Sequence, residues 1–171
     1  MSVKWASHNV GATSPEGYGS YFAWGELTSK DSYYFNNNST YNQAFSDISG
    51  NADYDAATAN WGKPSRIPTN AEMEELKNNT IREWTTLNGV KGYKITSKTN
   101  GNSIFLPAAG FRFGMGLKND GLEGYYWTSE PFESNDNNAY FLHLKDDKSS
   151  WDFNLNYGFR YNGQCVRPVS D

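Results

Sequence analysis

Apolar and polar residues alternate over much of the last third of the chain. Alternation of this kind is the period of a strand that buries one face and leaves the other in water. Tyr140, Leu142 and Leu144 fall on one face of such a strand. Phe141 and His143 fall on the other face. We therefore expect a half-buried strand at this place.

Two stretches around this strand, residues 130–138 and 152–162, combine Asn, Ser, Asp and Gly with large side chains such as Phe and Tyr. Loops run over the surface because their backbone groups need water. Their large side chains must therefore either pack onto the body of the protein or face a partner. Two interpretations stay open. The aromatic side chains either pack onto an ordinary sheet, or they form a recognition surface together with adaptable polar groups.

The clearest helix signal begins at Thr69. Glu72 follows three positions later, which is the pattern of a capping box. Met73 and Leu76 then fall on one helix face. A second, shorter helix is expected over residues 53–61, where aspartates stand at the N-terminal end.

The rest of the chain favours strands and loops. Before the helices we expect an aromatic-rich strand over residues 18–26 and a long, Asn-rich loop over residues 27–51. After them, an Asn-Gly turn at Asn88 predicts a hairpin, and a third strand is expected at residues 103–106. Residues 108–124 contain five glycines and are expected to form a folded loop.

Composition narrows the class of protein. A chain of 171 residues suits one domain and needs no disulfide or metal to hold its core. Only 37% of the residues are hydrophobic, but 16% are aromatic, so the core must rely on Trp and Tyr, whose polar edges need partners.

Charge and hydropathy exclude several partners. The net charge is −4 and no basic stripe is present, so we expect no nucleic-acid partner. No apolar run approaches about 18 residues, so we expect no membrane insertion. The first residues lack the apolar core of a signal peptide, which indicates either a protein not exported by that route or an excised domain.

Several motifs resemble one family. The run Ser65-Arg66-Ile67-Pro68-Thr69-Asn70-Ala71-Glu72 is similar to the start of a helix in the formylglycine-generating-enzyme type of C-type-lectin-like domain. The ending Gly163-Gln164-Cys165-Val166-Arg167-Pro168-Val169 resembles the last strand of that group. Further landmarks, from Trp5-Ala6 and Tyr21-Phe22-Ala23-Trp24-Gly25-Glu26 to Tyr125-Tyr126-Trp127-Thr128-Ser129, resemble paralogous domains of gut Bacteroidetes and their phages.

The resemblance implies a single α+β domain over residues 1–171, with a C-type-lectin-like fold in which two helices pack on short antiparallel β-sheets. It also implies that the N- and C-terminal strands lie close together. Residues 1–124 would be the scaffold and residues 125–169 a variable ligand-binding region, in which Trp127, Ala139, Leu142, Trp151 and Arg167 form a frame.

In many such relatives, a diversity-generating retroelement rewrites this last region to vary the binding surface. Those domains sit on phage tail fibres or on bacterial cell surfaces, where the partner is a protein or a glycan. Together with the pattern of the two polar and aromatic stretches, this places the candidate ligand-binding surface at Glu130, Phe132, Glu133, Phe141, His143, Asp152, Phe153, Asn154, Leu155, Asn156, Tyr157 and Phe159.

Enzyme chemistry is the first competing interpretation, because well-known members of this group oxidise a substrate cysteine. Their active site holds copper between two cysteines, whereas this chain has only Cys165. A lone cysteine also excludes an internal disulfide, and we expect a buried, inert thiol. We therefore expect no enzymatic activity and no cofactor.

Calcium-dependent sugar binding is a second competitor. Glu130-Pro131-Phe132 and Trp151-Asp152-Phe153 echo the two calcium motifs of sugar-binding C-type lectins. Phe stands where each motif supplies a ligand, and calcium needs six to eight oxygens, so we expect no metal site. Glu133 and Asp136 indicate a solvated acidic loop rather than a pair of catalytic carboxylates.

Two functional hypotheses of different class remain. In the first, the domain is a non-catalytic ligand-binding module with aromatic anchors in its C-terminal loops. In the second, it is a structural or assembly domain, and the same aromatics form an interface between copies in a homo-oligomer.

Overall fold

The computed structural model describes residues 1–146, 148–149 and 152–171. Of these described residues, 38% lie in strands and 11% in helices. The helical segments are η1 (Phe35–Asn37), α1 (Ala56–Trp61) and α2 (Asn70–Asn78). The strands are β1 (Lys4–Trp5), β2 (Thr80–Leu87), β3 (Val90–Ser97), β4 (Ser103–Pro107), β5 (Phe111–Phe113), β6 (Gly116–Lys118), β7 (Glu123–Pro131), β8 (Asn138–Lys145), β9 (Phe153–Phe159) and β10 (Val169–Ser170).

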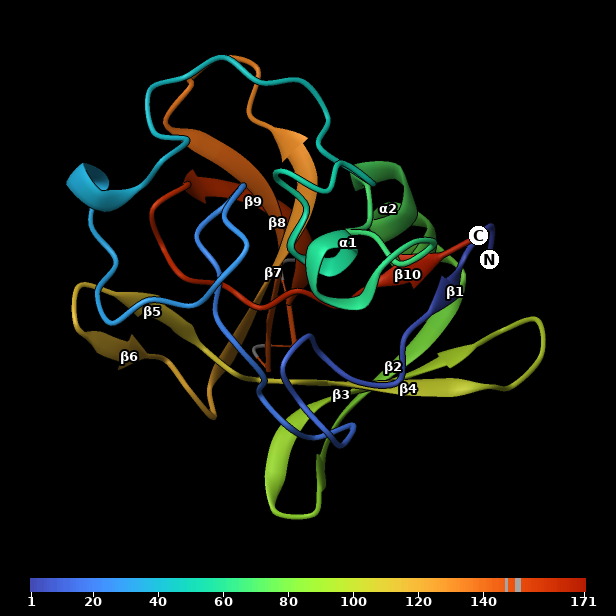
Figure 1. Cartoon of the computed structure of the whole chain (residues 1–171). Coiled ribbons are helices and arrows are strands. Elements are labelled where there is room, and N and C mark those ends of the chain that lie inside the picture. The colour runs from blue at the N-terminus through green and yellow to red at the C-terminus, as the bar shows by residue number, and fades with distance from the viewer. Residues whose placement is uncertain (147, 150–151) are drawn as a thin grey trace.

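In the described part of the chain these strands form four small antiparallel sheets, with the orders β1-β10, β2-β3-β4, β5-β6 and β7-β8-β9. β1 pairs with β10, so the two ends of the chain lie side by side (Figure 1). This confirms the expected closeness of the terminal strands. β5 and β6 form a short hairpin inside residues 108–124, where we expected only a loop.

The expected fold class, an α+β C-type-lectin-like fold with two helices packed on short sheets, is wrong: the protein is mostly β. α1 has six residues and begins where the Asp55 side chain accepts hydrogen bonds from two backbone N–H groups. A helix this short has little surface with which to cover a sheet. Its buried alanines instead pack beside Trp24 and Ile48 of irregular segments. α2 packs against the β7-β8-β9 sheet through Met73 and Leu76.

α2 begins with the predicted capping box. The Glu72 N–H donates to the Thr69 hydroxyl over 3.3 Å, and the Thr69 N–H donates to the Glu72 carboxylate over 2.9 Å. Arg66 adds a two-pronged ion pair to the same carboxylate, at 2.7 and 2.9 Å. The start of the helix is thus fixed by local sequence.

The predicted hairpin after α2 is also confirmed. β2 and β3 pair in register up to Leu87 and Val90, on either side of Asn88 and Gly89. Both turn residues have positive φ, 47° and 84°. This is the backbone that a two-residue hairpin turn requires, and Asn-Gly tolerates it best.

The segment 18–26 is not the strand that its composition indicates. Tyr21, Phe22, Ala23 and Trp24 are buried, yet only Phe22 makes a β-bridge, to Gln164. The following segment, residues 27–51, is irregular apart from η1, as expected. This long irregular region needs other partners for its backbone groups.

The sheet β7-β8-β9 lies at the centre of the molecule and is covered on both faces. Leu142 and Leu144 of β8 pack with Met73 of α2, whereas Ala139 and Phe141 pack with Trp127 and other aromatics on the opposite side. The expectation of one wet face on β8 is therefore wrong. Long irregular segments cover the second face, which sequence alternation alone does not show. Of the expected frame, Trp127, Ala139, Leu142 and Arg167 are buried, and Trp151 lies outside the described residues.

Two fully buried arginines tie irregular segments to the sheets. The Arg160 guanidinium donates to the carbonyl oxygens of Thr40, Gln43 and Asn138, at 2.7 to 3.0 Å, and stacks on the Trp24 ring. Burial lowers the pKa of this guanidinium. Because the group stays charged and its partners are backbone carbonyls, Arg160 replaces the pairing that a sheet would give the irregular segment.

Arg167 does the same at the other end of the molecule. Its guanidinium donates to the Asn9 side chain at 2.8 Å and to the Phe105 carbonyl at 2.8 Å, and also reaches the carbonyls of Ala6 and Ser7. It thereby joins the segment after β1 to β4. Neither α1 nor α2, the α-helices of the described residues, is long and apolar enough to span a bilayer.

Replacing Arg160 with Met should lower the free energy of unfolding by about 3 kcal/mol or more, because buried carbonyl groups would lose their donors. Urea denaturation followed by tryptophan fluorescence measures this. Lys118→Met removes the same charge from an exposed position and should change the free energy by less than about 0.5 kcal/mol. Equal losses in the two variants would contradict the role given to Arg160.

Glu72 should make stability depend on acid pH. Burial opposes ionisation of its carboxyl, but hydrogen bonds from Arg66 and Thr69 outweigh burial and hold the pKa below the ordinary value of 4.5. Its contribution is therefore complete above that value and is lost as the pH falls through the lowered pKa. Between about pH 5 and pH 3, Glu72→Gln should lose less stability than the unmodified protein. Glu74→Gln, on the same helix but away from Arg66, is the control for removing one carboxylate, and an equal change in both variants would contradict the role given to Glu72.

Candidate functional site

β9 carries the largest group of the predicted site residues and changes character along its length. Phe153, Leu155, Tyr157 and Phe159 alternate onto one face, opposite Leu144, Leu142, Tyr140 and Asn138 of β8. Phe153 is only 1% exposed and Leu155 is half-buried, whereas Tyr157 is 49% and Phe159 48% exposed. The strand therefore starts in the core, under α2, and ends at the surface.

The exposed end of this face holds a small aromatic cluster. The Phe132 ring stacks on the Tyr157 ring with a centroid distance of 3.9 Å and an angle of 7°. Tyr140 meets both rings edge-on, at 5.5 and 6.4 Å. The Tyr140 hydroxyl donates to the Glu133 carboxylate at 2.8 Å. The cluster thus joins the β7–β8 connection to β8 and β9 with its rings already in place.

A hydroxyl and a carboxylate in this cluster keep fixed protonation states near neutral pH. Burial, followed by the hydrogen bond to Glu133 and the negative charge of that carboxylate, raises the pKa of Tyr140 to about 12. Hydrogen bonds to its own backbone N–H and to Tyr140 lower the pKa of Glu133. Tyr140 therefore remains a donor and Glu133 an acceptor, and the carboxylate keeps free lone pairs for a ligand.

Asn154 and Asn156 are the other predicted site residues on β9. They lie on the opposite face of the strand, on the side of His143. There the His143 ring stacks on Tyr125, at 4.8 Å, and its Nε2 lies 3.0 Å from the Glu123 carboxylate. Burial opposes the charge on Glu123, but hydrogen bonds from Tyr125 and His143 outweigh it and lower its pKa. His143, Asn154 and Asn156 line a shallow pocket of about 260 Å³. The predicted site residues are thus divided between two faces of one sheet.

Several predicted site residues hold the fold together instead. The Glu130 carboxylate accepts hydrogen bonds from the backbone N–H and the side chain of Asn70, at 2.8 and 3.1 Å, at the start of α2. Phe141 and Phe153 belong to the two core clusters. The Asp152 carboxylate accepts a hydrogen bond from the Tyr93 hydroxyl at 3.2 Å. The expectation that residues 152–162 form a loop is wrong for residues 153–159, which form β9, and Phe153 begins this strand inside the core.

A second group of exposed and half-buried aromatics contains one predicted site residue, Phe159, and several rings that the sequence analysis did not single out. Phe159 stacks on Tyr161 at 5.0 Å, and the Tyr161 ring meets Tyr41 at 5.9 Å and Phe113 at 6.3 Å. Phe35 and Tyr34 extend this contact chain beyond Tyr41 and Phe113. We call these six residues the aromatic ridge: Tyr34, Phe35, Tyr41, Phe113, Phe159 and Tyr161. The signal in residues 34–41 was the same mixture of Asn and large aromatics that marked the last third.

The ridge brings together three segments that are distant in the sequence. Residues 34–41, which include η1, supply three rings, and the β5–β6 hairpin supplies Phe113. The end of β9 and the turn after it supply Phe159 and Tyr161. Figure 1 shows η1, β5 and the end of β9 on one side of the molecule, away from the termini and α2. Only the tertiary structure makes these rings neighbours.

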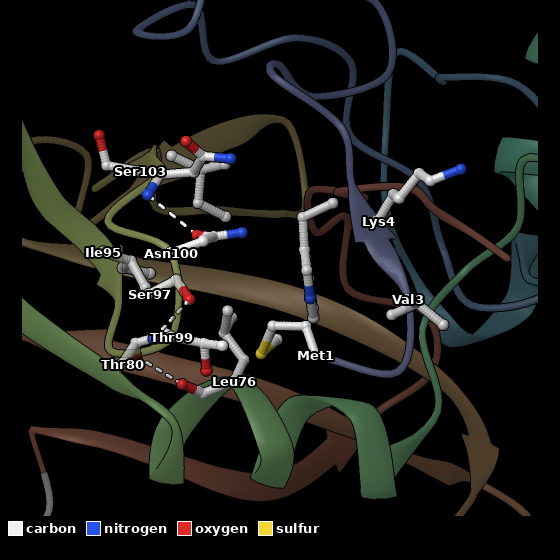
Figure 2. Close-up of a pocket in the computed structure, with 13 residues that line it drawn as sticks. Met1, Val3, Lys4, Leu76, Thr80, Ile95, Ser97, Thr99, Asn100 and Ser103 are labelled. Carbon is white, nitrogen blue, oxygen red and sulfur yellow. Dashed lines mark hydrogen bonds between the residues drawn. The ribbon is translucent and has the colours of Figure 1, made fainter.

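An apolar pocket of about 440 Å³ lies on the other side, between β1, the end of α2 and the β3–β4 turn (Figure 2). Val3, Leu76 and Ile95 form its apolar wall, and Asn100 and Ser103 stand at its polar rim. None of the predicted site residues lines it. It brings no group of catalytic side chains together.

Two side chains that could act as a nucleophile or a general base, Cys165 and His8, lie outside the aromatic surfaces. Cys165 is fully buried, as expected, and burial raises the pKa of its thiol to about 12. The His8 ring packs 5.1 Å from Trp61. Among residues 1–146, 148–149 and 152–171, no three His, Cys, Asp or Glu side chains gather in a way that could hold a metal ion. Trp151, part of the calcium-motif echo, lies outside these residues.

Comparisons with models of known protein families, with curated proteins and with solved structures find no match to this chain. The assignment of a function therefore depends on the geometry of the molecule.

The division of β9 into a core half and a surface half can be tested by stability. Phe153→Ala should lower the free energy of unfolding by about 3–5 kcal/mol, because it empties a buried aromatic site. Tyr157→Ala, the matched control on the same face, should cost at most about 1.5 kcal/mol, the value of an aromatic pair. Urea denaturation of both variants gives the two numbers, and a reversed order would contradict this division.

Proposed function

We propose that this chain is a non-catalytic ligand-binding module that contacts its partner through the exposed end of the β7-β8-β9 sheet. The observation that carries the proposal is the exposure of Tyr157 and Phe159 on a strand whose first half is core. Large apolar rings in water contribute little to folding, and a cluster of them marks an interaction site. Phe132 and Glu133 border the same surface.

The geometry suits binding because the aromatic side chains are already ordered before a partner binds. Phe132, Tyr140 and Tyr157 already pack against one another, so their side-chain entropy is largely lost before a partner arrives. Aromatic anchors of this kind carry most of the energy in protein interfaces. Glu133 adds a polar group beside them.

The resemblance to variable proteins of diversity-generating retroelements extends the proposal. In that interpretation residues 125–169 are a varied region and the domain acts on a phage tail fibre or a bacterial surface, where it binds a protein or a glycan. The exposed positions on β9 are compatible with variation, because their side chains can change without emptying the core. The neighbouring DNA bears on this point, since a template repeat and a reverse transcriptase gene identify such a system.

The test is binding of the fluorescently labelled domain to a panel of intact gut bacteria, measured by flow cytometry. The unmodified domain should bind at least one strain, and the double variant Tyr157→Ala, Phe159→Ala should bind at least about tenfold more weakly. Ile81→Ala removes a side chain that is 63% exposed on β2 and should bind like the unmodified domain.

Light scattering on the same samples separates binding from assembly. A monomer in both the unmodified and the doubly substituted form supports the module. If the substitutions turn an oligomer into monomers and leave cell binding unchanged, these aromatics are a subunit interface and the proposal fails. It also fails if the unmodified domain binds no strain.

A further inference from the structure

The aromatic ridge lies next to the surface proposed above but is built mainly from residues outside the last third of the chain. Phe35 is 58% and Phe113 44% exposed, and neither belongs to a core cluster. Phe159 belongs both to the ridge and to the proposed binding surface. The ridge therefore continues that surface across the β5–β6 hairpin and η1.

One buried residue holds the ridge in shape. Arg160 stands between the outward rings of Phe159 and Tyr161, and its own side chain points into the protein. Its guanidinium donates to the carbonyl oxygens of Thr40 and Gln43, at 3.0 and 2.7 Å. These two residues lie on either side of Tyr41. The same group thus fixes the backbone on both sides of the contact between Tyr41 and Tyr161, so the rings form a preorganised surface.

The segments that build the ridge are nearly without exposed charge. No charged residue occurs between Asp31 and Asp47, nor from Phe113 to Leu117. From Phe153 to Gly163 the only charged residue is Arg160, which is fully buried. The chain carries 15 Lys and Arg and 19 Asp and Glu, so a region with few charges is a distinct feature of its surface.

Amide side chains stand where charges are missing. Asn36, Asn42 and Gln43 are exposed beside the rings of Phe35 and Tyr41. An amide offers two donors and an acceptor without a charge. A partner recognised here must therefore match flat aromatic faces and neutral hydrogen-bonding groups.

A neutral polysaccharide has this chemistry. The C–H groups of a pyranose ring form an apolar face with partial positive charge, which stacks on the negative face of an aromatic ring. Its hydroxyl pairs match the donors and acceptors of amides. Neighbouring ridge rings lie 5.0 to 6.5 Å apart, and most are tilted or edge-on to one another, so the ridge offers several separate ring surfaces to a chain of linked sugars.

We infer that the aromatic ridge binds a neutral glycan chain by ring stacking and amide hydrogen bonds. An acidic polysaccharide is disfavoured, because the protein carries a net charge of −4 and cations are few around the ridge: Lys118 flanks the β5–β6 hairpin, and Lys30 is paired with Glu26. A protein partner is the alternative outcome, and the experiments below distinguish it from a glycan. This inference rests on the proposed binding function and names its ligand class.

Affinity gel electrophoresis tests the inference with mannan, laminarin, galactan and dextran as neutral probes, and alginate and polygalacturonate as acidic ones. At least one neutral polysaccharide should retard the unmodified domain, and the acidic ones should not. Phe35→Ala and Phe113→Ala should each weaken the affinity by about three- to tenfold, the value of one aromatic contact. Ile81→Ala should leave it unchanged, and melting temperatures show whether each variant is folded.

Pretreatment of the bacteria that bind the domain separates the two proposals. Periodate, which cleaves glycan diols, should abolish cell binding, and proteinase K should leave it intact. Loss of binding with proteinase K alone would show a protein partner and overturn the glycan inference while the binding function stands. Failure of all four neutral polysaccharides, equal retardation of the ridge variants, or a dimer that Phe113→Ala dissociates would also overturn it.

Discussion

The structure depends on buried guanidinium groups that donate to backbone carbonyl oxygens. Residues 6–55 form little regular structure, yet Tyr21, Phe22 and Trp24 within them are buried. Buried peptide groups need hydrogen-bond partners, and an irregular segment cannot supply them from its own ladder. Arg160 and Arg167 provide several donors each from one rigid, permanently charged group, which is why an arginine suits this task and a lysine does not.

The need for buried hydrogen-bond donors also explains why buried and exposed side chains follow one another directly in the sequence near the end of β9. Phe159 and Tyr161 point outward while Arg160, between them, reaches the core. β9 combines burial and exposure in the same way along its whole length. Phe153 and Leu155 pack under α2, and Tyr157 lies at the surface. The exposed rings are therefore attached directly to the most buried part of the protein. A surface held in this way binds without first having to become ordered.

Features of the chain that depend on neighbouring residues could be predicted from sequence. The capping box of Thr69 and Glu72, the turn at Asn88 and the long loop after residue 26 follow from local hydrogen bonds and backbone preferences. The exposure of Tyr157 and Phe159 fits the expectation of a wet aromatic surface near the end of the chain. The core positions of Phe141 and Phe153 could not be predicted, because alternation shows which residues share a face but not what covers it.

The amino-acid sequence by itself determined the helix start, the hairpin and the segments rich in Asn and aromatics, since each depends on contacts within a few residues. The tertiary structure decided that the protein is mostly β, that both faces of β8 are covered, and that Tyr41, Phe113 and Tyr161 meet in one ridge. The physical reason is that burial and ring contacts join segments as far apart as residues 34 and 161. Such contacts form only when Arg160 and the central sheet bring the segments together.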